Sequence, residues 1–244
     1  MKKTRFIIAT GLAAALGTAG IAFADGASEN VESVTGKVSP SKLSKKTAKP
    51  VDMTTTVATT TTHAVPGQQN PEKQLIEFGK NIKFDTTKAA TCSANLAGTT
   101  TDQAKQMCPS KSIIGTGSAS ADLGGGPQQV TDTQVTVFNG PAKNQIRLHA
   151  FTPELGPANT QVVEGSIIKA PSGGKYGQAL NVADAPDLAG DAFMLTSFGA
   201  KITKKSKVVT GVCKAGKFLW HNKVTYDDGS TDVADAEQKC TVKK

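Results

Sequence analysis

Apolar and polar residues alternate at every second position along most of the chain, and helical spacing of apolar residues is rare. A period of two is typical of strands with one buried face. Gly and Pro occur in almost every gap between the alternating segments, as expected of turns. The pattern predicts an all-β fold, an antiparallel β-sandwich of about ten strands. The predicted strands are 51–57, 74–84, 134–138, 145–151, 160–168, 175–182, 193–202, 207–212, 217–226 and 231–242.

The clearest local signal is a hairpin near the C-terminal end of the sequence. Asp228-Gly229 separates two alternating runs, and an Asp-Gly pair in this setting is typical of a tight hairpin turn. Trp220 is the one tryptophan of the chain, and we expect it to be a core anchor rather than a platform for a ligand. The predicted buried face of this strand comprises Phe218, Trp220, Val224 and Tyr226.

One short helix is predicted inside the first half of the chain. Thr100 and Gln103 have the spacing of a capping box, in which the two side chains bind each other's backbone N–H groups. Pro109 ends the segment because it cannot continue a helix. We assign this helix a structural role only.

Two segments leave the domain organisation open. The Thr-rich run 54–62 fits either a strand or a glycosylated linker, and the alternating Val51, Met53 and Val57 favour the strand. Residues 63–72 fit either a linker or a long loop. We therefore predict a single β-sandwich domain over 31–244, preceded by a short flexible N-terminus at 25–30.

The first 24 residues have the pattern of a secretory signal peptide. A basic start is followed by an uncharged apolar stretch from Phe6 to Ile21, and Ala22-Phe23-Ala24 supplies the small-x-small cleavage pattern. Cleavage there lowers 28 basic residues to 25 against 20 acidic ones, so the net charge falls from +8 to +5. We expect a secreted or extracytoplasmic protein that does not span the membrane once processed.

The charge surplus indicates which partners are compatible. After cleavage the chain keeps one arginine, Arg147, and its other basic residues are lysines. Nucleic-acid readers rely on arginine forks for bidentate contacts, so the composition argues against a nucleic-acid partner. A weak ionic contact with anionic envelope polymers or lipid headgroups is compatible with the surplus, and the lysines at 201, 204, 205 and 207 are candidates for it.

Four cysteines in an exported chain favour two disulfides. Three connectivities are open, and the spacing favours the pairs Cys92–Cys108 and Cys213–Cys240. The spacings lack the CxxC and HxxxH patterns of zinc sites, so we expect no metal at these residues.

No catalytic motif stands out. The chain has no GxSxG, no HExxH and no phosphate-binding loop. We expect His149 and His221 to face solvent, and His63 to lie in a loop. Two groups of aspartates, 184/187/191 and 227/228/232/235, are weak candidates for Ca²⁺. Tyr176 is the one aromatic in a loop-like setting, so glycan binding has little support. We therefore assign no catalytic, cofactor-binding or metal-binding residue.

A set of segments along the chain carries a resemblance: 37–43, 78–92, 108–119, 138–140, 175–177 and 213–240. Through this set the chain resembles a group of exported β-rich proteins common in actinobacteria, over roughly residues 31 to 244. That group has no assigned activity, so the resemblance carries over no functional residue. It implies one extracytoplasmic domain that begins near residue 31, supports the two cysteine pairs and favours a strand for the Thr-rich run.

Two functional classes follow from the sequence. The absence of a catalytic constellation favours a non-enzymatic extracytoplasmic protein, which binds a ligand or has a structural role in the cell envelope. The alternative is a secreted hydrolase or glycan-active enzyme whose site is assembled from distant loops, since loops on such scaffolds often carry function.

Overall fold

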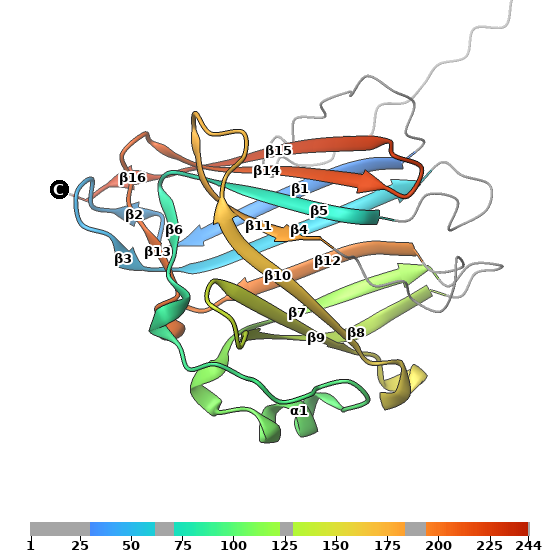
Figure 1. Cartoon of the computed structure of the whole chain (residues 1–244). Helices are drawn as coiled ribbons and strands as arrows, with labels where there is room; N and C mark the ends of the chain where they lie inside the picture. Colours follow the sequence, from blue (N-terminus) through green and yellow to red (C-terminus); the bar gives the residue numbers. More distant parts are fainter. Residues whose placement is uncertain (1–29, 62–70, 123–128, 184–193, 244) are drawn as a thin grey trace, which may run out of the picture.

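The computed structural model describes residues 30–61, 71–122, 129–183 and 194–243. Within them, eleven strands form one antiparallel sheet (Figure 1). These strands are β1 (Asn30–Ser39), β4 (Asp52–Thr61), β5 (Pro71–Gly79), β7 (Ile113–Asp122), β8 (Gln129–Asn139), β9 (Gln145–Phe151), β10 (Gln161–Lys169), β11 (Tyr176–Val182), β12 (Met194–Ile202), β14 (Lys217–Tyr226) and β15 (Thr231–Lys239). Their order in the sheet is β1-β4-β12-β7-β8-β9-β10-β11-β5-β14-β15.

Shorter elements gather at one end of this sheet. A three-stranded sheet has the order β3-β13-β6, and β2 pairs in parallel with β16. Figure 1 shows these strands together on the left. The shorter strands are β2 (Lys42–Leu43), β3 (Lys49–Pro50), β6 (Ile82–Phe84), β13 (Val209–Gly211) and β16 (Thr241–Val242). The helix is α1 (Thr101–Met107), and the 3₁₀ turns are η1 (Thr86–Lys88), η2 (Ser110–Ser112), η3 (Pro153–Leu155), η4 (Pro157–Asn159) and η5 (Lys204–Ser206).

The main sheet curls into a nearly closed barrel, so the prediction of a sandwich is wrong. Its two edge strands, β1 and β15, come together without a backbone ladder, and side chains of β15 bridge the seam. The Asp232 carboxylate accepts the N–H of Glu32 at 2.7 Å, and the Gln238 amide binds both the N–H and the carbonyl of Val38. Alternation with one buried face is the same in a barrel and in a sandwich, so the sequence pattern alone could not distinguish them.

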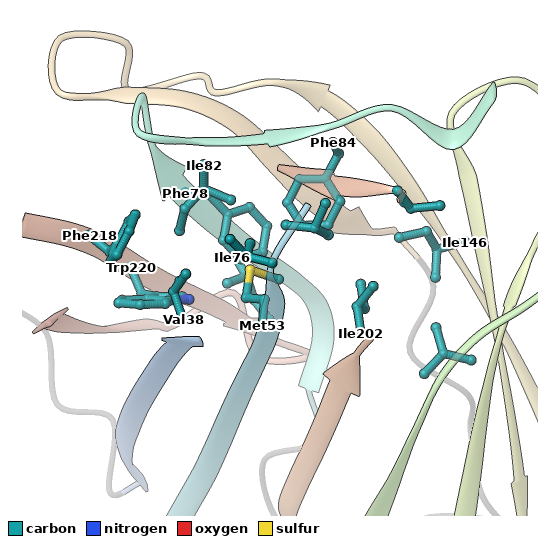
Figure 2. Close-up of a cluster of buried hydrophobic side chains, with 14 of the residues drawn as sticks. Val38, Met53, Ile76, Phe78, Ile82, Phe84, Ile146, Ile202, Phe218 and Trp220 are labelled. Atoms are coloured by element: carbon teal, nitrogen blue, oxygen red, sulfur yellow. The ribbon is translucent and has the colours of Figure 1, made fainter. Parts of the chain in front are cut away.

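The barrel interior is a single hydrophobic core (Figure 2). Trp220 is fully buried against β1, and its Nε1–H donates to Thr55 Oγ1 at 3.2 Å. The predicted buried face of β14 is confirmed, because Phe218, Trp220, Val224 and Tyr226 are at most 1% exposed. The predicted turn is confirmed as well, since β14 and β15 pair on either side of Asp228-Gly229.

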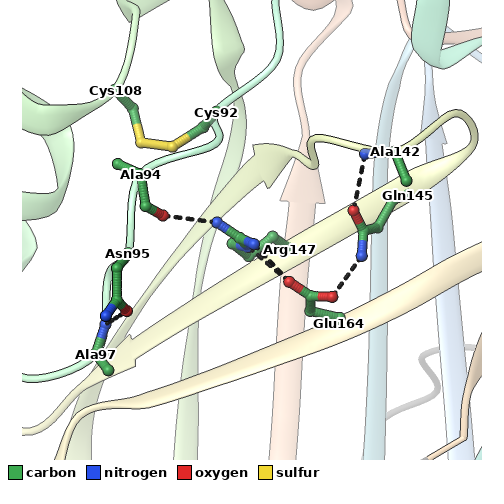
Figure 3. A network of polar contacts seen from close by, with 9 residues as sticks. All are labelled: Cys92, Ala94, Asn95, Ala97, Cys108, Ala142, Gln145, Arg147 and Glu164. Atoms are coloured by element: carbon green, nitrogen blue, oxygen red, sulfur yellow. Dashed lines mark hydrogen bonds and ion pairs between the residues drawn. A yellow bond between two sulfur atoms is a disulfide. The ribbon is translucent and has the colours of Figure 1, made fainter.

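A smaller core lies outside the barrel wall, under the predicted helix. The capping box between Thr100 and Gln103 is present, and Cys92–Cys108 is one of two disulfides, the other being Cys213–Cys240. Both predicted pairs are therefore confirmed. Arg147 on β9 ties the loop before α1 to the wall, because it donates to the Ala94 carbonyl at 2.8 Å and pairs with Glu164 (Figure 3).

Two strands of the barrel were not predicted. The sequence left open whether the N-terminal stretch joins the sheet, and β1 pairs with β4 along its whole length. The strand β7 is rich in Gly, Ser and Ala, which are poor strand signals. Gly115 and Gly117 are required there because a Cβ at either position would overlap the backbone of β12.

The Thr-rich run forms a strand through Thr61, since β4 pairs with β1 on one side and with β12 on the other. The predicted signal peptide at 1–24 lies outside the described residues, as do 25–29 and 62–70. Residues 71 and 72, the end of the segment expected to be a linker or loop, already belong to β5.

Candidate functional site

The end of the barrel that carries the short strands is rich in lysine. Three chain segments, 42–52, 80–88 and 201–214, meet there through β3, β13 and β6 and through backbone hydrogen bonds such as Cys213 N–H to Ser44 O at 2.9 Å. We call this surface the lysine end. Its exposed lysines are Lys42, Lys45, Lys46, Lys49, Lys80, Lys83, Lys88, Lys201, Lys204, Lys205, Lys207 and Lys214.

The positive charge of the lysine end is barely compensated. The same three segments contain 12 lysines and two acids, Asp52 and Asp85. Asp85 pairs with Lys88 at 3.6 Å, and the hydrogen bonds from Thr87 hold the pKa of the Asp85 carboxyl below its usual range. Asp52 accepts the backbone N–H of Lys204. Among the described residues, no other lysine of this surface forms an ion pair.

The opposite end of the barrel carries a small polar pocket. The register places Glu32 of β1 beside Thr59 of β4, and Gln74 of β5 beside Val224 of β14, all near the strand ends remote from the lysine end. We call this hollow the mouth pocket; its volume is about 20 Å³. It is lined by Glu32, Val57, Ala58, Thr59, Pro71, Gln74, Leu195, Ser197, Phe198 and Val224.

Glu32 is the chemically distinctive residue of the mouth pocket. Its Oε1 accepts the hydroxyl protons of Thr59 at 2.6 Å and Tyr226 at 2.7 Å, and its Oε2 accepts a longer bond of 3.3 Å from Asn222. Burial is the largest influence on the carboxyl, and with the nearby Asp232 it raises the pKa of Glu32. Burial beside Glu32 raises the pKa of the Tyr226 hydroxyl as well, so that group stays a proton donor.

A second cavity lies deeper in the barrel and is almost entirely apolar. Its volume is about 40 Å³, and its walls come from β4, β5, β6, β8, β9, β11 and β12. Val57 and Phe198 line both cavities, so the two share a wall. The polar group at the mouth and the apolar space behind it give the barrel interior an amphipathic character.

A row of polar side chains crosses the outer wall on three adjacent strands. Glu77, His221 and Asp235 lie opposite one another in the register of β5, β14 and β15. His221 Nδ1 and the Tyr176 hydroxyl both bind Asp235 Oδ1, at 3.0 and 2.9 Å. Ser172 N–H donates to Glu77 at 2.8 Å and holds the β10–β11 turn over it. Within the described part of the chain, no hydroxyl or thiol is hydrogen-bonded to His221, so the row lacks an activated nucleophile.

The structure corrects two predictions about single residues. His149 was expected to face solvent, but it is fully buried under the loop before α1, where Nε2 lies 3.0 Å from Thr99 Oγ1 and burial lowers its pKa. Tyr176 was expected in a loop, but it begins β11 and is 6% exposed. His221 is half-buried and paired with Asp235. His63 and Asp184, Asp187 and Asp191 lie outside the described residues.

The second aspartate group is dispersed rather than joined. Asp232 points into the barrel seam, whereas Asp235 points outward to Tyr176 and His221. Over residues 30–61, 71–122, 129–183 and 194–243, no three His, Cys, Asp or Glu side chains converge closely enough to hold a metal ion.

The comparisons with known proteins give no family. No protein-family model matches the chain, and no curated protein is significantly similar to it. In the described residues, no helix has the length and apolar character needed to cross a membrane. Two disulfides are typical of an oxidising compartment.

The mouth pocket was not predicted. Glu32 is in phase with Val34 and Val38 on the buried face of β1, but this stretch was not predicted to be a strand. Its neighbours in space are 27 to 200 residues away in the chain. The lysine end was partly visible, because Lys201, Lys204, Lys205 and Lys207 form a basic run. The contributions of 42–49 and 80–88 appear only when β13 pairs with β3 and β6.

Proposed function

We propose that this protein is a non-enzymatic extracytoplasmic binding protein that attaches to an anionic envelope polymer through the lysine end. The observation that carries the proposal is the concentration of 12 exposed lysines against two acids on three segments that meet at one end of the barrel. A surface with one sign of charge attracts a polyanion from a distance and holds it through many weak contacts.

A polymer fits this surface better than a lipid bilayer does. Proteins that lie on membranes insert large apolar side chains beside their basic residues. The exposed large hydrophobic residues among the described ones are Val31, Met107 and Val242. Only Val242 lies beside the lysine end, where it pairs with Leu43 of β2, and a single valine is not an apolar patch that inserts into a bilayer. Lysine carries a point charge on a flexible side chain, which suits a polymer of repeated phosphates better than a single small ligand of fixed shape.

The test uses immobilised inorganic polyphosphate as the probe and the processed chain as the analyte. If four lysines contact phosphates, and each contributes a salt slope of about 0.7, the affinity falls by about 50-fold between 50 and 200 mM NaCl. The variant K204E/K205E/K207E should bind at least tenfold more weakly at 50 mM NaCl, because it reverses three charges of η5 and the residue after it.

A charge-matched control separates location from net charge. K73E/K105E/K223E changes the net charge by the same amount with lysines of β5, α1 and β14, which lie outside the three segments of the lysine end. This control should bind polyphosphate within about threefold of the unmodified protein, while circular dichroism checks that both variants are folded. Equal losses in the two variants would overturn the proposal, and so would binding to anionic lipid vesicles without binding to polyphosphate.

A further inference from the structure

The mouth pocket has the features of a second binding site, independent of the lysine end. It is a hollow at the other end of the barrel, and three of its lining residues, Thr59, Gln74 and Ser197, are partly exposed. Glu32, by contrast, is 6% exposed and lines the hollow. A buried ionisable group in a concave pocket is a common mark of a ligand site.

The charges around the mouth pocket select a positively charged ligand. Glu32 and Asp232 are both buried and adjacent, joined by the bond from Glu32 N–H to the Asp232 carboxylate. Among the described residues, no lysine or arginine is buried in the barrel to balance them. An ionised carboxylate in such a place is costly unless a cation accompanies it.

The hydrogen bonds of the Glu32 carboxylate restrict the class of cation further. A carboxylate offers about four acceptor positions. Thr59 and Tyr226 occupy two of them on Oε1, and Asn222 occupies one on Oε2 through a bond of 3.3 Å. Oε2 therefore keeps capacity for a further donor, which favours a cation with N–H groups over a quaternary ammonium or a bare alkali ion.

The volumes set the size of the ligand. About 10–15 Å³ accommodates one water-sized group, so the 20 Å³ mouth pocket holds one ammonium group. The 40 Å³ cavity behind it has space for about three more groups of that size. Its lining is apolar apart from Thr55, so those groups are methylenes rather than polar atoms.

We propose that the mouth pocket binds a primary ammonium group carrying a short alkyl chain of about three carbons, with Glu32 as the anionic partner and the chain passing between the side chains of Val57 and Phe198, which line both spaces, into the apolar cavity. A free alkylamine or the terminal amine of a larger molecule presents this chemistry. The proposal does not depend on attachment of the lysine end to a polymer.

The experiment measures the melting temperature of the processed protein with methyl-, propyl-, hexyl- and tetramethylammonium chloride, each against NaCl at equal concentration. A propylammonium concentration of a hundred times its Kd should raise the melting temperature by roughly 5–10 °C. Methylammonium should bind more weakly because it leaves the apolar cavity empty, and hexylammonium because it exceeds the cavity. Tetramethylammonium should cause no shift, since it has no N–H donor.

Two variants and a pH series test the role of Glu32. E32Q should lose the propylammonium shift, whereas E164Q, on the outer wall, should keep it. S197L leaves the carboxylate in place and fills the pocket, so it tests the site without changing Glu32 and should lose the shift as well. Affinity should rise as the pH is raised above the ordinary glutamic acid range, because burial raises the pKa of Glu32 and its carboxyl ionises only above that range. No propylammonium shift beyond that of NaCl, or an undiminished shift in E32Q or S197L, would overturn the proposal.

Discussion

The contact between Gly36 and Trp220 is the sharpest test of how the barrel is closed. β1 approaches the inside of β14 so closely that a Cβ built on Gly36 would overlap three atoms of the indole ring, Cδ2, Cε2 and Cζ2. The ring cannot withdraw, because Trp220 is fully buried and its N–H is bound to Thr55. Gly36→Ala must therefore displace either the indole ring or the edge strand.

The expected cost follows from that overlap. Overpacking of a well-filled core costs about 1–3 kcal/mol, and we expect the upper end because neither partner has free space. For a domain of this size, about 3 kcal/mol lowers the melting temperature by roughly 6–12 °C. The measurement is urea unfolding followed by far-UV circular dichroism, because variants with Trp220→Phe contain no tryptophan, together with a thermal scan under non-reducing conditions.

The matched control is Gly177→Ala. There, the nearest atom to an added Cβ is Lys80 Cγ at 3.4 Å, which is an ordinary contact with a flexible side chain. Its stability should stay within about 0.5 kcal/mol of the unmodified protein. Combining Gly36→Ala with Trp220→Phe removes the overlapping ring edge, so the double variant should be less destabilised than the sum of the two single changes. Additive losses would refute the steric explanation.

Three further predictions concern buried groups. Burial raises the pKa of Glu32, so the unmodified protein loses stability as the pH rises above the ordinary glutamic pKa and this carboxyl has to ionise. E32Q should therefore gain stability relative to the unmodified protein as the pH rises above that value. A difference in the free energy of unfolding that stays the same at every pH would contradict this. Replacing Cys213 and Cys240 with alanine opens a loop of 27 residues and should cost about 3.5 kcal/mol in urea unfolding; an unchanged midpoint would contradict it. The Asn139 amide donates to three backbone carbonyls, so Asn139→Asp should lower stability by about 3 kcal/mol or more. The control is Asn95→Asp, which should be nearly neutral because Asn95 is exposed and its Oδ1, which accepts the N–H of Ala97, is kept in the aspartate.

The sequence by itself determined the local structure of this protein. Alternation located most strands, and β9 and β14 have the predicted bounds of 145–151 and 217–226. The capping box at Thr100 predicted α1, and cysteine spacing favoured the two observed disulfides. These features depend on neighbours in the chain or on short loops, so a single sequence contains the necessary information.

Tertiary structure alone decided how the strands close and what the closure brings together. Sandwich and barrel share the same alternation, and the difference lies in the seam where Asp232 and Gln238 replace a backbone ladder between β15 and β1. His149 looked like a solvent-facing residue because the loop that covers it comes from about 50 positions earlier in the chain. The lysine end and the mouth pocket arise in the same way, since long-range pairing collects charges and cavities from residues that no local pattern connects.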